Sequence, residues 1–470
     1  MMAKRIARRR FLSIFGAGAS VALLSACAQG TPTPTQAPAP TQAAAPTASG
    51  GAAQPTAVPA KPAAAPTQAP AKGGSGTAVF WFNQPAQMEG FQTIVDRFHK
   101  MQSKVKLEVV LVPTTDLRTK LATSIAGGSP PDAVRLHGST SLITEFKDHL
   151  ADLGQWEPNL KQTDWIPGVL EGITRDGKIK SMPCNSGCFG FIYNPKVYKD
   201  AGLDPDKPPT TQDELLEYAK QISKPDQQIW GHYTTTLVTQ TTGGDYFKAI
   251  LWGHGGSEVS ADGKKTTLNS PEAVAALQWY IDLVQKNKGM PVQQVNETQL
   301  WNAFMTGKVG SIGTYPSGVA RIAGAPIESR SALYPKGHVD APHINLGFAT
   351  IGVFAKGKNP EAGWEFAKFI GLDPDNLAFW NAAFGQLPPR FSARESQVWK
   401  DYAAKTPLVN GFVEGQKAAR LPYYGPGAAE MENEVAKAIE AVVFGQKTAQ
   451  QAANDANAAA QAVLDRVLKQ

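Results

Sequence analysis

The sequence predicts an α/β protein whose folded part forms two lobes, each assembled from pieces of chain that lie far apart in sequence. Between residues 77 and 136, strand-like and helix-like segments alternate, which favours an open, largely parallel sheet with right-handed crossovers. Three later stretches rich in glycine, proline or aromatic residues, 177–202, 344–354 and 420–427, are suited to carry the chain between lobes. Clefts between lobes commonly bind ligands.

Residues 1–26 have the parts of a secretory signal peptide. A basic start is followed by an apolar run that is too short to span a membrane, and then by LSAC, which ends at Cys27. The run RRRFL from Arg8 resembles a twin-arginine export motif, with Sec export as the alternative. LSAC resembles the lipobox of bacterial lipoproteins. This resemblance implies that Cys27 is lipidated and anchors the protein to the outer face of the cell membrane.

The basic character of the chain belongs to this leader. The net charge is +6, but five of the 46 Lys and Arg residues lie in the first ten positions. The remaining 41 basic residues face 40 acidic ones, a net charge of +1. The composition therefore gives no indication of a nucleic-acid partner.

Residues 27–76 are predicted to form a disordered tether. After Cys27 they are almost entirely Pro, Thr, Ala, Gln, Gly and Ser, with Lys61 and Lys72 as the only charges. Such a composition cannot bury a core. We expect a flexible connection with an average reach of about 40 Å, after which the folded part begins at Thr77.

The first lobe is predicted to begin with three strands and two helices. Apolar segments of strand length occupy 77–82, 105–112 and 133–136, and helices are expected at 90–101 and 115–126. In parallel sheets, ligands lie beyond the carboxyl ends of the strands. The loops that begin at Asn83 and His137 are therefore expected at a binding site.

The stretch 177–202 is predicted to be the main crossing between lobes. A strand is expected to break between Pro183 and Gly187, to resume at 189–193, and to lead into a helix that Gly202 closes. Cys184 and Cys188 lie within it, in a compartment that permits disulfides. A Cys184–Cys188 disulfide and two free thiols are both open outcomes, and the spacing does not favour a metal site.

The second lobe is predicted to be mainly helical around a short strand. Helices are expected from the PPTTQDE segment to residue 222 and at 243–256, 270–285 and 300–307, with a strand at 309–312 that leads to Tyr315. After the second crossing come a helix at 359–370, an aromatic loop at 379–390 and helices at 428–444 and 448–468. Lobe 1 is then 77–184 and 350–418, and lobe 2 is 185–349 and 419–470.

Six segments in order carry a resemblance to a known family. They are GGSPPDAV from 127, DGKIKSMP from 176 with FIYNPKVYKDAGL from 191, PPTTQDELLEYAKQI from 208, FMTGKVGSIGTY from 304, NPEAGWEFAKFI from 359, and FGQLPPR from 384. The series resembles the extracellular solute-binding protein family 1, the maltose-binding type of sugar-binding proteins of ABC importers. The chain departs from the family pattern at Tyr315, where the family has Trp, and in the loop 136–139, and both departures bear on the substrate.

The resemblance implies a two-lobed fold of the type II periplasmic-binding-protein kind, with discontinuous lobes joined by hinge crossovers and a cleft that closes on its ligand. It also implies an extracytoplasmic component of an ABC importer that delivers a carbohydrate, in our interpretation an oligosaccharide, to the permease transmembrane subunits. We expect a monomer that is not an enzyme and needs no cofactor.

A sugar presents apolar C–H faces and a rim of hydroxyls, so its site calls for aromatic rings flanked by polar side chains. Core packing is the competing interpretation for Trp81 and Tyr315, and a backbone hydrogen bond is the competing one for His137. The residues predicted to contact ligand are Trp81, Asn83, Gln84, His137, Ser139, Tyr233, Tyr246, Tyr315, Phe384, Arg390 and Tyr424.

Three alternatives stay open. A non-sugar solute, such as a polyol, glycerol phosphate or a polyamine, is the first, although the predicted loops carry few carboxylates for a polyamine and few basic groups for a phosphate. A secreted hydrolase is the second. The mature chain has no HExxH or GxSxG motif, but a pair of catalytic carboxylates stays open. A receptor lipoprotein that binds no small molecule tightly is the third.

Overall fold

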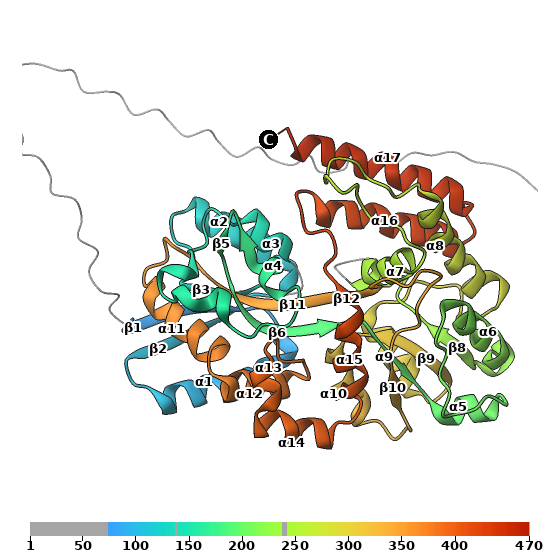
Figure 1. Cartoon of the computed structure of the whole chain (residues 1–470), viewed down its shortest axis with the longest axis horizontal. Helices are drawn as coiled ribbons and strands as arrows, with labels where there is room; N and C mark the ends of the chain where they lie inside the picture. The colour runs from blue at the N-terminus through green and yellow to red at the C-terminus, as the bar shows by residue number, and fades with distance from the viewer. Residues whose placement is uncertain (1–73, 137–139, 237–241, 470) are drawn as a thin grey trace, which may run out of the picture. The chain divides into compact units, whose positions relative to one another are not determined.

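The computed structural model describes residues 74–136, 140–236 and 242–469, all within one compact unit formed by residues 69–470 (Figure 1). The signal peptide, Cys27, nearly all of the tether, His137 and Ser139 lie outside the described residues. Within the described part of the chain, no helix is both long enough and apolar enough to cross a membrane. The folded part begins with a strand at Gly76, one residue before the predicted start.

The first lobe is built around a sheet in the order β12-β11-β3-β1-β2, with β6 also paired with β11. The strands are β1 (Gly76–Phe82), β2 (Val105–Leu111), β3 (Ala133–Leu136), β6 (Met182–Cys188), β11 (Ile344–Val353) and β12 (Ala419–Arg420). β1 runs parallel to both β2 and β3, and α1 (Met88–Met101) and α2 (Thr114–Ala126) connect them. The predicted alternation of parallel strands and helices is confirmed.

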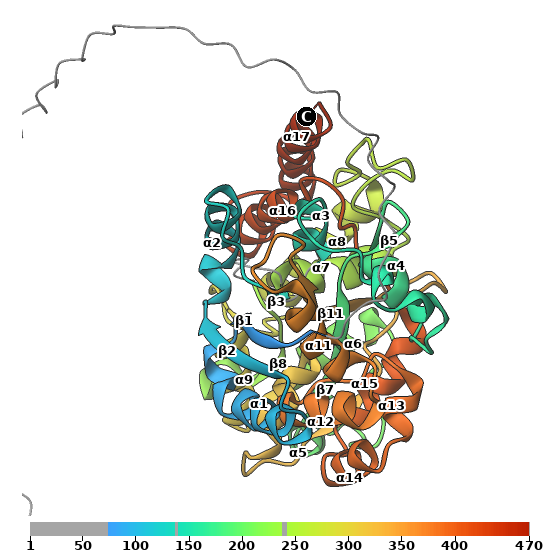
Figure 2. The same cartoon turned by 90° about the vertical axis from the view of Figure 1, so that its left-hand side faces the viewer.

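Aromatic rings hold the core of the first lobe together. The Phe82 and Phe91 rings stack with centroids 4.1 Å apart, and the ring of Phe366 meets Phe80 edge-on at 4.9 Å. Phe91 lies on α1 and Phe366 on α11 (Pro360–Gly371), so both helices are fixed against β1 (Figure 2). These contacts bury one face of β1 beneath the two helices. The remaining helices of this lobe are α3 (Thr140–Glu145), α4 (Val169–Ile173), α12 (Pro374–Phe384) and α13 (Phe391–Glu395).

The second lobe is built around a smaller sheet in the order β10-β7-β9-β8. Its strands are β7 (Gly190–Tyr193), β8 (Trp230–Tyr233), β9 (Val309–Thr314) and β10 (Arg330–Ala332). Its helices include α5 (Pro195–Asp200), α6 (Gln212–Ile222), α7 (Thr242–Gly253), α8 (Pro271–Ile281), α9 (Glu297–Met305), α10 (Val319–Ala323), α16 (Ala428–Val443) and α17 (Ala449–Val467). Thr211 caps α6 in a capping box with Glu214, as the sequence indicates.

The crossing between the two sheets lies at Phe189, between β6 of one sheet and β7 of the other. The predicted break at Pro183–Gly187 is wrong, because β6 runs unbroken from Met182 to Cys188. Its pairing with β11 shifts register between Ala349 and Thr350, which matches a bulge next to Pro183. A bulge accommodates a residue that lacks a backbone N–H, so the strand continues past the proline.

The two cysteines of β6 do not form a disulfide. Both are free and buried, with Cys184 in the core of the first lobe and Cys188 in that of the second. Four positions along an extended strand separate their Cα atoms by about 13 Å, which is beyond the reach of a disulfide. Of the two predicted outcomes, free thiols is the one that the structure supports.

The chain returns to the second lobe earlier than predicted. Val409 and Phe412 belong to the core of the second lobe, so α15 (Val409–Gly415) lies with it, whereas the prediction assigned residues up to 418 to lobe 1. The preceding helix, α14 (Gln397–Lys405), packs against α12 and α13 of the first lobe. The contact that fixes α15 is tight, because a Cβ at Gly190 would lie 2.5 Å from the Phe412 ring. The predicted aromatic loop at 379–390 is also partly helical, as the last part of α12.

Candidate functional site

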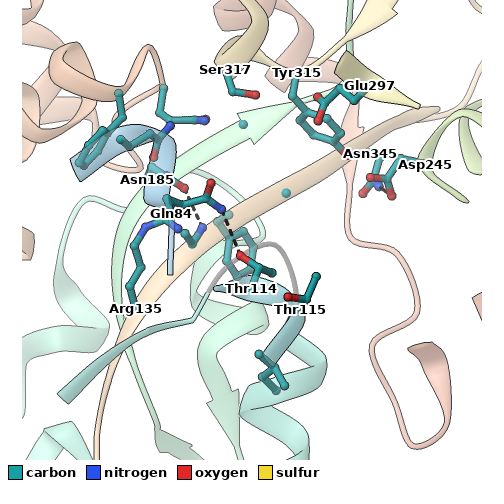
Figure 3. Close-up of a pocket in the computed structure, with 18 of the residues that line it drawn as sticks. Gln84, Thr114, Thr115, Arg135, Asn185, Asp245, Glu297, Tyr315, Ser317 and Asn345 are labelled. Carbon is teal, nitrogen blue, oxygen red and sulfur yellow. Dashed lines mark hydrogen bonds between the residues drawn. The ribbon is translucent and has the colours of Figure 1, made fainter. Parts of the chain in front are cut away.

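A cavity of about 940 Å³ is lined by residues from both lobes and from the two long crossover strands (Figure 3). The first lobe supplies mainly polar side chains, which include Gln84, Thr114, Thr115 and Arg135. β6 and β11 supply Asn185, Gly187, Asn345 and Gly347. The second lobe and the third crossing supply the charged and aromatic groups, which include Asp245, Lys248, Glu297, Trp301, Tyr315, Arg321, Tyr424 and Glu432.

The wall from the first lobe is a hydrogen-bonded set at the carboxyl ends of β1 and β3. Arg135 Nη1 donates to Asn83 Oδ1 at 2.9 Å, and Thr114 Oγ1 donates to the carbonyl of Asn83 at 2.8 Å. Gln84 Nε2 reaches Thr114 Oγ1 at 3.4 Å. These bonds fix the direction of Arg135 and Gln84, whose side chains line the cavity.

Arg135 is a buried cation at the edge of the cavity. Its guanidinium lies 5.8 Å from the centre of the Phe82 ring, and burial lowers its pKa. Its Nε has no hydrogen-bond partner among the residues that the structure describes. A buried donor of this kind is satisfied when a ligand oxygen approaches it.

Two glycines make room for the ring of Tyr315. Gly187 of β6 and Gly347 of β11 face each other in the paired strands. A Cβ at Gly187 would lie 3.4 Å from Tyr315 Cδ1, and one at Gly347 would lie 3.3 Å from Cε1. The ring therefore rests against bare backbone at the junction of the lobes. Burial, together with the nearby charge of Asp245, raises the pKa of the Tyr315 hydroxyl well above its ordinary value.

A group of carboxylates marks the wall from the second lobe. Lys248 Nζ is bonded to Glu432 and lies 3.5 Å from Asp245 Oδ1, so two acids share one lysine. Burial raises the pKa of Asp245 to about 7, and Glu432 adds to the shift while Lys248 opposes it. Burial also raises the pKa of Glu297 to about 7, with Asp245 adding to that shift.

Asn345 connects the crossover strand to these acids. Its side chain is 1% exposed, and its Nδ2 donates to Asp245 Oδ1. Its Oδ1 has no hydrogen-bond partner within the described part of the chain. Figure 3 shows Asn345 and Asp245 side by side, with Glu297 and Tyr315 next to them.

Comparisons with known proteins decide the family. The family model of the bacterial extracellular solute-binding protein matches residues 81–376, more than half of the chain. The chain belongs to this family.

Relatives of this solute-binding protein are distant but cover most of its length. A binding protein of Brucella abortus is 23% identical over 80% of this chain and 90% of its own, and the diacetylchitobiose binding protein DasA of Streptomyces coelicolor is 25% identical over 63% and 69%. Among solved structures, the cyclic alpha-maltosyl-1,6-maltose binding protein from Arthrobacter globiformis is 26% identical. It has a TM-score of 0.71 and covers 84% of this chain and 100% of that one. UgpB from Mycobacterium tuberculosis, in complex with glycerophosphocholine, has a TM-score of 0.74 at 21% identity, with coverage of 84% and 100%. The two-lobed α/β fold is thereby established.

The cavity of this solute-binding protein contains four of the predicted ligand residues: Gln84, Tyr315, Phe384 and Tyr424. Tyr315 and Phe384 are among its lining residues, and the Tyr424 hydroxyl donates to the carbonyl of Leu346 at 3.3 Å. Their contact with a ligand stays a prediction. His137 and Ser139 lie outside the described residues.

Trp81 and Asn83 do not line the cavity. Trp81 alternates with the buried Phe80 and Phe82 along β1, so its side chain lies on the other face of the sheet, where it packs half-buried against the first core. Asn83 is fully buried and orients Arg135 from behind. Arg135, to which Asn83 is hydrogen-bonded, lines the cavity in its stead.

Tyr233 and Tyr246 are core residues. Tyr233 ends β8 with its ring among the buried side chains of the second lobe. The Tyr246 ring meets Phe189 edge-on at 4.3 Å. Tyr246 follows Asp245 on α7, and residues that are adjacent in a helix point in different directions. The helix therefore turns the acid to the cavity and the aromatic ring to the core.

Arg390 does not line the cavity and holds the chain together elsewhere. Its Nε donates to Asp164 Oδ1 at 2.7 Å and its Nη1 to the carbonyl of Leu372 at 2.6 Å. Its guanidinium also lies 5.6 Å from the centre of the Trp165 ring. Through these contacts the side chain holds the end of α11 and the segment before α13 in place.

The residues that sequence reasoning missed are mostly charged and come from helices. Asp245 and Lys248 lie on α7, Glu297 is the first residue of α9, and Glu432 lies on α16. Trp301 has the apolar helical spacing of a core residue, yet it also lines the cavity. No local motif marks these positions. The one feature of the sequence that could have indicated them is a polar residue beside a predicted aromatic contact, as Asp245 is beside Tyr246.

The cavity offers surfaces for stacking and groups for hydrogen bonding. Its rings include those of Trp301, Tyr315, Phe348, Phe384 and Tyr424, and its amides and hydroxyls include those of Gln84, Thr115, Asn185, Ser317 and Gln386. Among the described residues no group of His, Cys, Asp and Glu has the arrangement of a metal site. The arrangement suits the binding of a polyhydroxylated solute.

Proposed function

We propose that this protein is the extracytoplasmic substrate-binding component of an ABC importer and that it captures a carbohydrate, an oligosaccharide, between its lobes. The observation that carries the proposal is the joining of aromatic rings and neutral hydrogen-bonding side chains in one cavity that both lobes line. Rings cover the C–H faces of a sugar and remove apolar area from water, while amides and hydroxyls pair with its hydroxyls. Closure of the lobes then presents the bound solute to the permease.

The named relatives support a carbohydrate over other solutes. DasA is a diacetylchitobiose binding protein, and the Arthrobacter structure is a cyclic alpha-maltosyl-1,6-maltose binding protein. Other relatives point to glycerol phosphate derivatives, namely the sn-glycerol-3-phosphate-binding UgpB proteins of several Brucella strains and UgpB of Mycobacterium tuberculosis. In this chain, however, the Arg118 Nε is 3.1 Å from Glu145 and Lys248 is paired with Glu432. Two of the four basic side chains that line the cavity therefore already have acid partners, which leaves Arg135 and Arg321 as the basic groups available to a phosphate.

The proposal is tested with a panel of solutes on the folded unit, residues 69–470. Mono- and oligosaccharides, polyols, glycerol phosphate and polyamines are added, and thermal unfolding and tryptophan fluorescence are recorded. A ligand at 100 times its dissociation constant stabilises the native state by about 2.7 kcal/mol, which raises the midpoint of unfolding by several degrees. A saturable shift with one oligosaccharide series supports the proposal. A shift with a phosphate or polyol alone contradicts it.

We also propose that the mature protein is a monomer, tethered to the outer face of the cell membrane by a lipid on Cys27. The sequence LSAC before the tether supports this arrangement. In cells that process lipoproteins, Cys27→Ala is expected to abolish the incorporation of labelled palmitate and to move the protein from the membrane to the soluble fraction. Retention of the Cys27→Ala variant in the membrane fraction would show that something other than this lipid holds it there.

A further inference from the structure

Two carboxylates and an amide oxygen come together in one part of the cavity. We call it the acidic corner and define it as the carboxylates of Asp245 and Glu297 and the buried side-chain Oδ1 of Asn345; all three residues line the cavity (Figure 3). The three come from different elements, α7, α9 and β11, which the fold brings together.

The side-chain amide of Asn345 has one acceptor atom without a hydrogen-bond donor among the described residues. The side chain is 99% buried, and its Nδ2 is committed to Asp245. Its Oδ1 has no partner among the residues that the structure describes, although it belongs to a residue that lines the cavity. Buried acceptors are almost always paired in native structures, so a ligand that brings an N–H or O–H to this atom completes the site.

The charges near the corner are not balanced. Lys248 is shared between Asp245 and Glu432, and the buried Glu258 adds a further acid near that lysine. Glu297 faces Arg321, whose guanidinium lies 4.4 Å from the centre of the Trp301 ring. When all groups are ionised, four acids face two cations. Burial is the main cause of the raised pKa values of Asp245 and Glu297, and the neighbouring acids add to both shifts.

We propose that the acidic corner binds a protonated amino group of the solute, so that the carbohydrate carried by this protein is an amino sugar or an amino-substituted oligosaccharide. The inference rests on the proposed function, because the aromatic rings of the same cavity supply the contacts to the sugar ring. An ammonium group has three N–H donors and no acceptor, which matches a corner of three acceptor groups. A hydroxyl brings a single donor and leaves the excess charge in place.

The test uses the full chain and isothermal titration with matched sugars. Gluco- and galacto-configured mono- to tetrasaccharides are compared in three forms that differ only in an amino, an acetamido or a hydroxyl group at C2, and putrescine and spermidine are added as amines without a sugar ring. The amino form is expected to bind at least about tenfold more tightly than the hydroxyl form, as one charge-assisted hydrogen bond provides.

Each outcome separates the inference from the proposed function. Equal or tighter binding of the hydroxyl or acetamido form overturns the acidic corner and leaves the carbohydrate proposal intact. Binding of putrescine or spermidine without any sugar supports recognition of an amine and overturns the carbohydrate. A response to none of these solutes overturns both.

Two variants locate the effect. Glu297→Gln is expected to remove most of the preference for the amino form while it retains binding of the hydroxyl form, and Asp245→Asn is expected to do the same. Glu297 has no hydrogen bond to another described residue through its carboxylate, so its replacement keeps the test valid even where Asp245→Asn fails to fold. Glu361→Gln is the matched control, because Glu361 is also an acid in the first turn of an Asn-capped helix but lies outside the cavity. A Glu297→Gln protein with an undiminished preference would contradict the assignment.

Discussion

Tyr315 is the residue at which the two lobes and the cavity meet. We predict that Tyr315→Ala weakens binding of the carbohydrate ligand by about 10- to 100-fold, because a buried aromatic face contributes on the order of 1.5–3 kcal/mol. Tyr315→Phe keeps the ring and should lose much less. Titration calorimetry with the ligand found in the panel measures both.

Tyr218→Ala is the control for this change. Tyr218 is a half-buried tyrosine on α6 whose hydroxyl donates to the carbonyl of Lys207, and it lies outside the cavity. Its removal should leave affinity unchanged. If Tyr315→Ala binds as well as Tyr218→Ala does, the ring of Tyr315 is packing and not a ligand surface.

His232 makes the stability of the second lobe depend on pH. The ring is fully buried on β8, its Nδ1 lies 3.0 Å from Ser311 Oγ, and burial lowers its pKa to about 3. In the unfolded chain the ordinary pKa is about 6.5, so acid protonates the unfolded state first. Stability from this group is therefore present at neutral pH and lost as the pH falls from about 6.5 toward 3.

We predict that His232→Gln removes about 2 kcal/mol of the stability loss between pH 7 and pH 5. Denaturant unfolding of both proteins at the two pH values measures the difference. The raised pKa values of Asp245 and Glu297 act with the opposite sign, since they make the folded state more stable as the pH falls below about 7. An identical loss in the two proteins would mean that His232 is charged in the folded state.

Helix α15 ties the C-terminal part of the chain to the second lobe. Phe412 packs directly on Gly190 of β7, where no side chain larger than hydrogen fits. We predict that Phe412→Ala lowers the free energy of unfolding by about 3–5 kcal/mol, because it leaves a cavity against the strand. Phe391, which is 51% exposed on α13, is the matched control, and Phe391→Ala should cost less than about 1 kcal/mol. Equal effects in urea unfolding would place α15 outside the core.

Much of the element order could be predicted from sequence, and the exceptions have physical reasons. The alternation in 77–136 and the capped helix after Thr211 depend on local periodicity and capping, which neighbouring residues encode. The continuity of β6 through Pro183 depends on its partner β11, more than 150 positions away, whose shifted register accommodates the proline. The return of α15 to the second lobe depends likewise on Phe412 meeting Gly190.

The site was harder to predict than the fold. Gln84 and Tyr315 could be predicted as site residues because they follow strands, and the carboxyl ends of parallel strands meet at one edge of a sheet. Asp245, Glu297 and Glu432 lie on helices, where the direction of a side chain depends on how the helix is rotated against its neighbours. Tyr246 shows the difficulty, because a single step along α7 separates a cavity residue from a core residue.

The lobes are connected in a way that permits closure. β6 and β11 pair with each other and both line the cavity, so bending at these strands changes the distance between its walls. We predict that ligand shortens the distance between spin labels at Thr119→Cys on α2 and Lys437→Cys on α16, each one turn beyond a residue that lines the cavity. Electron double resonance measures it. The measurement uses residues 69–470, which exclude Cys27, and the two remaining native cysteines, Cys184 and Cys188, are buried and should label slowly.

A label pair within one lobe is the control for closure. Thr119→Cys and Lys100→Cys both lie in the first lobe, on α2 and α1, so their separation should stay the same with ligand. A shortening in both pairs would indicate general compaction. No change in either pair at saturating ligand would show that this protein binds without hinge motion.

The position of β11 in the first sheet has a consequence for synthesis on the ribosome. β11 lies between β3 and β12 and also pairs with β6, so a strand that ends at Val353 occupies the middle of a sheet that starts at Gly76. The first lobe cannot complete its hydrogen bonding until that strand has emerged. Synthesis from Gly76 to Val353 at about 5–20 residues per second takes on the order of 15–55 s, during which the nascent chain has unpaired strand edges. A chaperone or translocase that engages this chain has that interval in which to act before the first lobe closes.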